Sequence, residues 1–218
     1  MKTQSITFPV SDSIGEVSAI LYLPDKPKAI LALAHGAGAG MTHNFLEKLA
    51  TQLADRGIGT FRYNFPFIEQ RKKRPDVPAV AEKTVGAALE HAQSLTPRGV
   101  PLYAAGKSFG GRMSARYLSV NDKAFVKGII FYGFPLHAPG TPTTERAEHL
   151  ANVKIPMLFL QGTRDALAQI DLITGVCSKL PTATLVTFEG ADHSFKKGKK
   201  EFLEELVEAT DTWLKKKS

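Results

Sequence analysis

The sequence predicts an α/β protein built on a doubly wound, mostly parallel sheet of about seven or eight strands. Two observations support this. Continuously apolar runs, typical of strands covered on both faces, recur from residue 29 onward. Segments with helical periodicity separate these runs, which favours right-handed crossovers between parallel strands. With 218 residues, 43% of them hydrophobic and 22% charged, the chain can form one substantial core, so we expect a single domain over residues 1–218.

The chain begins with two segments, 4–10 and 16–23, in which polar and apolar residues alternate. Turn formers at 11–15 join them, so we expect an antiparallel pair at one edge of the sheet. Strands are then predicted at 29–34, 58–65, 102–105, 126–133, 155–162 and 183–189, of which those at 29–34 and 126–133 are of the buried type. Helices are predicted from an N-cap at Thr42 to a stop at Gly57, at 79–95, after Ser108, at 166–179 and around Leu206.

The most informative stretch lies at 101–113, where a strand-like run meets Gly106, Ser108 and Gly110 and a helical segment follows. This is a GxSxG pattern between a strand and a helix. Small neighbours let the strand and helix approach closely while the serine stands exposed on a strained turn. The amide of Phe109 would lie at the helix N-terminus, where it could bind an oxyanion.

Two other interpretations of this stretch exist. A P-loop ending in Gly106, Lys107 and Ser108 would need a glycine at the position that holds Pro101. A serine between glycines can also be an ordinary tight turn, and only the rest of the chain can decide between a turn and a nucleophile.

A second glycine-rich loop, 35–40, follows the buried strand at 29–34. The dinucleotide pattern GxGxxG fails because Met41 occupies its last glycine position. The loop fits better as the source of a second oxyanion donor, from the amide of Ala37 or Gly38, with Ala37 preferred. We interpret His35 as a brace for this loop.

An acid and a histidine follow two later strands. Asp165 comes just after the strand at 155–162, and His193 just after the strand at 183–189. Ligands bind at the carboxyl ends of the strands in such sheets, so Ser108, Asp165 and His193 are expected to meet there. Asp192 is a rival acid, but its place beside His193 directs it elsewhere. His137, after the strand at 126–133, is a candidate substrate contact.

The order serine, aspartate, histidine is that of the α/β-hydrolases. The chain resembles the small, lidless α/β-hydrolases of the dienelactone-hydrolase-like superfamily, and most closely the testis-expressed/NSL-complex-subunit type. The resemblance covers nearly the full chain and rests on the motifs His35-Gly36-Ala37-Gly38, Gly106-Lys107-Ser108-Phe109-Gly110-Gly111-Arg112, Pro135-Leu136-His137 and Ala191-Asp192-His193-Ser194. It implies an α/β-hydrolase fold. The interval between 133 and 155 has room for one short helix, so we expect no cap domain and a shallow, open site.

These residues together predict a serine hydrolase that cleaves a small-molecule carboxylic ester or thioester through an acyl-enzyme. Ser108 would be the nucleophile, His193 the general base and then acid, and Asp165 the residue that holds the imidazole. A non-catalytic interaction module on the same fold, or an acyltransferase using the same triad, remains an alternative. The sequence does not reveal the natural substrate or the oligomeric state.

Composition limits the other function classes. The single cysteine, Cys177, permits no intramolecular disulfide, and no Cys/His cluster suggests a metal or another cofactor. The net charge of +7 comes with basic clusters but no nucleic-acid motif, so we expect no nucleic-acid partner. Lys196 and Lys197 follow His193 closely and could favour an anionic substrate. Without a signal-peptide pattern or a membrane-length apolar run, we expect a cytoplasmic protein and no membrane partner.

Overall fold

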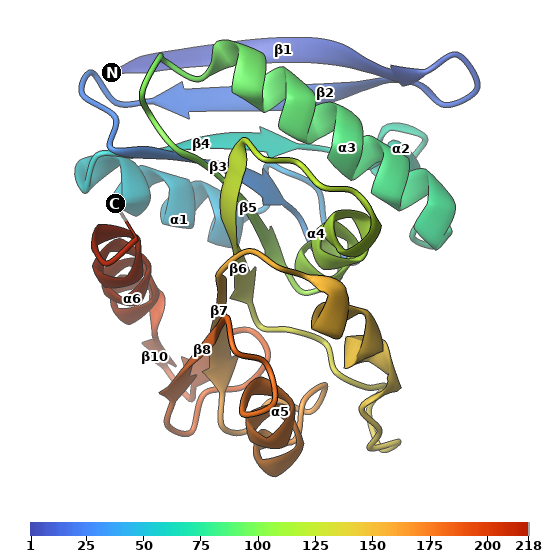
Figure 1. Cartoon of the computed structure of the whole chain (residues 1–218), viewed down its shortest axis with the longest axis vertical. Helices are drawn as coiled ribbons and strands as arrows, with labels where there is room; N and C mark the ends of the chain where they lie inside the picture. Colours follow the sequence, from blue (N-terminus) through green and yellow to red (C-terminus); the bar gives the residue numbers. More distant parts are fainter. Residues whose placement is uncertain (218) are drawn as a thin grey trace.

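The structure is a computed structural model and describes residues 1–217. In this part of the chain, eight strands form one sheet in the order β1-β2-β4-β3-β5-β6-β7-β8 (Figure 1). Strands β1 and β2 run antiparallel to each other, β2 runs antiparallel to β4, and the remaining neighbours are parallel. This confirms the α/β-hydrolase fold, the mostly parallel sheet and the antiparallel edge.

The strands are β1 (Lys2–Ser11), β2 (Gly15–Leu23), β3 (Ala29–Ala34), β4 (Ile58–Tyr63), β5 (Leu102–Lys107), β6 (Val126–Tyr132), β7 (Met157–Gly162) and β8 (Ala183–Phe188). The helices are α1 (Asn44–Asp55), α2 (Pro66–Glu69), α3 (Pro78–Leu95), α4 (Phe109–Val120), α5 (Ile170–Cys177) and α6 (Leu203–Lys215), with a 3-10 helix η1 (Glu145–Asn152). All residues of β3, β4 and β7 are buried, including the polar Thr60 and Arg62 of β4 and Gln161 of β7.

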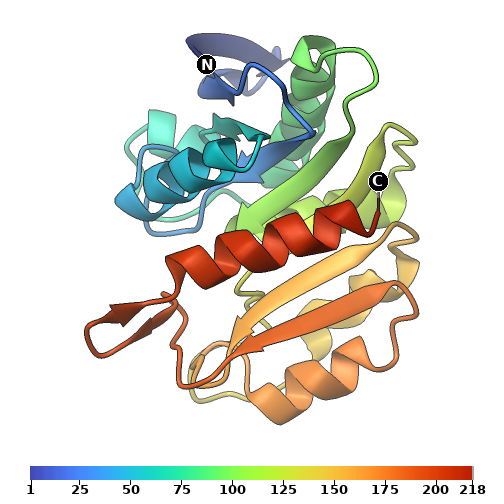
Figure 2. The same cartoon turned by 90° about the vertical axis from the view of Figure 1, so that its left-hand side faces the viewer.

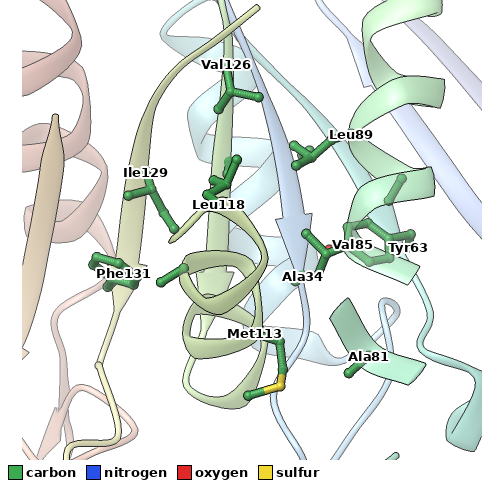
Figure 3. Packing of buried hydrophobic residues seen from close by; sticks show 14 of the residues in the cluster. Ala34, Tyr63, Ala81, Val85, Leu89, Met113, Leu118, Val126, Ile129 and Phe131 are labelled. Atoms are coloured by element: carbon green, nitrogen blue, oxygen red, sulfur yellow. The ribbon is translucent and has the colours of Figure 1, made fainter. Parts of the chain in front are cut away.

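Helices cover both faces of the sheet. Helices α1 and α6 contact each other on one face, and α3, α4, α5 and η1 lie on the other (Figures 1 and 2). The apolar core is accordingly divided into two clusters, one on each side. In the larger cluster, Met113 and Leu118 of α4 lie between Val85 of α3 and Phe131 of β6 (Figure 3).

Several boundaries differ from the sequence predictions. Helix α1 is capped by His43 and not by Thr42, because the His43 ring accepts the Phe45 amide. Helix α5 is shorter than the predicted segment 166–179, since the residues before Ile170 are used to build the loop that carries Asp165. Helix α2 and the hairpin of β9 (Lys196–Lys197) and β10 (Lys200–Glu201) were not predicted.

The connection from β6 to β7 contains only η1 and irregular chain, and no separate cap domain covers the sheet edge within residues 1–217. None of the helices described here is long and apolar enough to cross a membrane.

Candidate active site

The turn between β5 and α4 places Ser108 at the carboxyl end of the sheet. Ser108 has φ 50° and ψ −115°, a strained conformation for a residue with a side chain. The flanking glycines are sterically required. A Cβ atom on Gly106 would lie 2.2 Å from the Gly111 nitrogen, and one on Gly110 would lie 2.5 Å from the His35 oxygen. Only glycine therefore permits this approach of strand, helix and neighbouring loop.

The structure brings Ser108, His193 and Asp165 into one hydrogen-bonded chain. The Nε2 atom of His193 lies 2.8 Å from Ser108 Oγ, and its Nδ1 atom lies 2.7 Å from Asp165 Oδ2. The carboxylate of Asp165 is fully buried, whereas the His193 side chain is 24% exposed. The solvent-accessible part of this hydrogen-bonded set is thus the Ser108 hydroxyl and the His193 imidazole, and the Asp165 carboxylate is its buried part.

Asp165 is held in place by more than the imidazole. Its Oδ1 atom accepts a hydrogen bond from the Leu167 amide at 2.7 Å, and its Oδ2 atom accepts one from Gln161 Nε2 at 2.5 Å. The Oε1 atom of the fully buried Gln161 in turn accepts the Phe134 amide. Sequence reasoning missed Gln161, although a polar residue at the end of an otherwise apolar strand was a usable signal.

The loop that carries His193 is a tight turn built by Asp192. The Asp192 carboxylate accepts the amides of Ser194 and Lys196 at 2.8 and 2.9 Å, so the rival acid is engaged in its own loop. Gly162 lets this loop lie close to the loop that carries Asp165, because a Cβ atom on Gly162 would lie 2.3 Å from the Ala191 oxygen. The spacing of Asp165 and His193 depends on this close approach.

Lys107 is a second residue that the sequence analysis did not select. Its Nζ atom donates to the His193 carbonyl oxygen at 2.7 Å. Burial lowers the pKa of this ammonium to about 8, and the nearby charges of Asp165 and Asp192 oppose that shift.

The glycine-rich loop after β3 lies beside the turn that carries Ser108. His35 is fully buried; its Nδ1 atom bonds the Gly36 carbonyl, and its Nε2 atom accepts the Phe65 amide at 3.0 Å. Burial lowers the pKa of His35 to about 4, so the ring is neutral at pH 7. These contacts agree with a bracing role. Ala37 lies exposed in the same loop, and Phe109 is the first residue of α4, where an amide has no acceptor within its helix.

His137 is not placed as a substrate contact. It is buried, its Nδ1 atom bonds the Ala138 carbonyl, and its Nε2 atom accepts the Gln169 amide at 3.0 Å. Both ring nitrogens therefore bind main chain, and the residue braces the segment between Asp165 and α5. The sequence pattern did not distinguish a brace from a substrate contact, because a histidine that follows a strand can serve as either.

A cavity of about 640 Å³ opens next to Ser108 and His193, on the α1 and α6 side of the sheet. Its wall includes Ala37, Lys107 and a set of apolar side chains, namely Phe45, Leu46, Leu167, Phe195, Phe202 and Leu203. This size is typical of sites for small organic ligands.

The two lysines proposed near the mouth differ in position. Lys196 lines the cavity, and its ammonium pairs with Glu201 at 2.8 Å. Lys197 points the other way, as expected for the next residue of a strand, and its side chain lies against Gly190. Glu201 also lies 3.5 Å from the ammonium of Lys48, so the basic rim is partly neutralised.

Comparisons with known proteins agree with this architecture. The model of a family described as alpha/beta hydrolase domains matches residues 27–213. Among solved structures, dienelactone hydrolase from Anabaena variabilis is 20% identical, with a TM-score of 0.77 over 99% of each chain. Est1E from Butyrivibrio proteoclasticus is 15% identical, with a TM-score of 0.75 over 98% of each chain. The esterase domain of a Rhodothermus marinus protein is 17% identical, with a TM-score of 0.73 over 99% of each chain.

Proposed function

Because this chain belongs to the family of alpha/beta hydrolase domains, we propose that it is a serine hydrolase that cleaves a carboxylic ester or thioester through an acyl-enzyme. The observation that carries this proposal is the pair of short contacts from His193 to Ser108 and Asp165. They match the geometry expected of a nucleophile, a base and an orienting acid. Esterases and a dienelactone hydrolase among the similar structures support the same reaction class.

The first half of the reaction forms the acyl-enzyme. Ser108 Oγ attacks the substrate carbonyl carbon while its proton passes to His193 Nε2, and Asp165 stabilises the resulting imidazolium. When the tetrahedral intermediate collapses, the bond from carbonyl carbon to the alcohol oxygen or thiol sulfur breaks, and His193 gives its proton to that leaving group. In the second half, water gives a proton to His193 and attacks the acyl carbon. The bond from that carbon to Ser108 Oγ then breaks, and His193 returns the proton to Oγ, which releases the acid and restores free Ser108.

The amides of Phe109 and Ala37 are proposed to bind the oxyanion. Phe109 lies at the N-terminus of α4, where the helix dipole also favours negative charge, and Ala37 lines the cavity. Each donor of this kind contributes on the order of 10² to 10³ in rate.

The strained turn at Ser108 favours an enzyme over a non-catalytic interaction module. A positive φ at a residue with a side chain is costly, and such strain tends to persist where it serves a site. Whether water or another acceptor takes the acyl group depends on what the cavity admits. The exposed His193 edge gives water direct access, so hydrolysis is the preferred assignment.

We further propose that the substrate is a small acyl compound whose apolar part enters the cavity lined by Phe45, Phe195 and Phe202. A preference for an anionic ester would come from Lys196 and Lys48, and Glu201 should keep it weak. A likeness to the testis-expressed/NSL-complex-subunit type and a cytoplasmic location remain part of this proposal.

A fluorophosphonate probe tests the proposal directly. The wild-type protein should gain one covalent label by intact mass, and Ser108→Ala should gain none while losing about 10⁴- to 10⁶-fold in kcat on a short-chain ester. Ser119→Ala is a matched control, because this serine lies on the same helix and its hydroxyl bonds the Arg116 carbonyl. A folded wild-type protein that the probe does not label would remove the hydrolase assignment and favour an interaction module.

A further inference from the structure

Lys107 joins the nucleophile turn to the histidine loop. It immediately precedes Ser108, and its Nζ atom reaches the carbonyl oxygen of His193, 86 residues later in the chain. A hydrogen bond from an ammonium to a carbonyl is stronger than one between neutral groups. The side chain of Lys107 therefore connects the main chain of His193 to the residue directly before Ser108.

The surrounding residues leave room for this side chain. A Cβ on Gly133 would lie 3.2 Å from Lys107 Nζ and 3.4 Å from His193 Cε1, so the glycine makes space for both groups. The ammonium also lies 5.4 Å from the centre of the Phe195 ring, within the range of a cation–π interaction. Lys107 is thus enclosed by the loops after β6 and β8.

Charged groups around Lys107 keep its ammonium protonated at neutral pH. Asp165 and Asp192 both act on it, and both raise its pKa against the larger effect of burial, which leaves the value at about 8. The ammonium is therefore charged at pH 7, and it loses its proton in a pH range where the enzyme can be assayed.

We propose that Lys107 is a positioning residue, whose ammonium holds the His193 loop at the distance from Ser108 that proton transfer requires. This inference rests on the proposed hydrolase function. It goes beyond the Ser108, His193 and Asp165 set, because the motif GxSxG places no requirement on the residue before the serine.

The test compares Lys107→Met with Lys127→Met. Lys127 is a matched control, because its ammonium also donates to a main-chain carbonyl, that of Ala124, at 2.9 Å but on the surface. Lys107→Met should lower kcat about 10- to 100-fold with KM within about threefold, since small displacements of a catalytic group cost this much. Lys127→Met should match the wild type.

A chemical variant restores the ammonium. Lys107→Cys is alkylated with 2-bromoethylamine to give a side chain of similar length that ends in an ammonium. Cys177 should not react, because burial raises the pKa of its thiol to about 12. Alkylation should recover most of the lost kcat. In the wild type kcat should fall as pH rises through about 8. In the alkylated variant the fall should come at lower pH, because the sulfur weakens the amine as a base, and Lys107→Met should show no such fall.

Hydrogen exchange separates this inference from the hydrolase assignment. Amides of residues 191–196 should exchange faster in Lys107→Met than in the wild type and the Lys127→Met control, whether or not the protein hydrolyses esters. Faster exchange without a loss of kcat would reduce Lys107 to a structural role and overturn the proposal. Unchanged exchange, or a wild-type pH profile in Lys107→Met, would also overturn it. Failure of the fluorophosphonate probe to label the wild type would count against the hydrolase function instead.

Discussion

Two histidines follow strands at the same edge of the sheet and have opposite environments. His35, after β3, is fully buried, and both of its ring nitrogens contact main-chain groups. His193, after β8, is partly exposed, and its ring nitrogens contact the side chains of Ser108 and Asp165. The two residues share their type and their position relative to the sheet, so their different environments come from their hydrogen-bond partners and their burial.

In the proposed mechanism, histidine serves as a brace at position 35 and as a base at position 193. Burial disfavours the imidazolium of His35 and lowers its pKa to about 4, so this ring cannot accept a proton near neutral pH. The ring of His193 has a carboxylate on one side, which can stabilise an imidazolium, and a hydroxyl on the other. A fixed protonation state suits a brace, and a catalyst needs a ring that can gain and lose a proton.

The sharpest test of this comparison is His193→Ala. We expect kcat/KM for a short-chain ester to fall about 10⁴- to 10⁶-fold, because the serine loses its general base. The free energy of unfolding should fall by only about 1–2 kcal/mol, because the buried Asp165 carboxylate loses the imidazole but keeps the Gln161 and Leu167 donors. Ester hydrolysis and urea unfolding measure the two effects. His91 stacks on Phe8, far from the cavity, so the control variant His91→Ala should retain the wild-type rate.

His35→Ala should act mainly on the stability of the fold. The Phe65 amide would lose its acceptor inside the core and a void would form, so we expect the free energy of unfolding to fall by about 2–4 kcal/mol. Urea unfolding at pH 7 measures this loss. A variant as stable as the wild type would show that His35 is not a brace.

The pH dependence of stability gives a smaller, separate check. The pKa of His35 is about 4 in the folded protein and about 6.5 in an unfolded chain, so the unfolded state binds more protons between these values. The stabilising contribution is complete above pH 6.5 and is lost as pH falls toward 4, by roughly 2–3 kcal/mol. His149, whose pKa is also lowered to about 4 by burial and by Arg116 and Arg112, adds to the same slope.

Urea unfolding of the wild-type protein and of His35→Gln from pH 7 to 4.5 measures this pH-dependent contribution of His35 to the free energy of unfolding. The variant lacks the titrating ring, so its stability should decline less steeply over this range. Parallel curves for the two proteins would contradict the assignment of a buried, neutral His35.

The weakest expected effect concerns the rim of the cavity. Lys196→Gln should change the ratio of kcat/KM for anionic and neutral esters by less than about threefold, because its ammonium is exposed and already paired with Glu201. Glu201→Gln should raise the preference for anionic esters about two- to fivefold, since it frees Lys196 and Lys48. Equal ratios in both variants would remove the proposed role of this rim.

Much of the site could be predicted from residue order. The strand before Ser108, the glycines around it, and the acid and histidine after later strands are all local patterns, and the carboxyl ends of parallel strands share one edge of the sheet. Contacts between loops could not be predicted in this way. Lys107 and Gln161 each bond a partner that belongs to another loop, and neither stands in a motif that names its partner.

The fold class, the serine turn and the set of residues expected at the edge of the sheet could all be predicted from the amino-acid sequence, because periodicity and glycine spacing act locally. The folded structure was needed to show that His193 bonds Ser108, whereas His35 and His137 bond main chain. It also showed that Lys196 faces the cavity while Lys197 lies against Gly190. Burial and hydrogen-bond partners depend on groups distant in sequence, so the roles of His35, His137 and His193 separate only after the chain has folded.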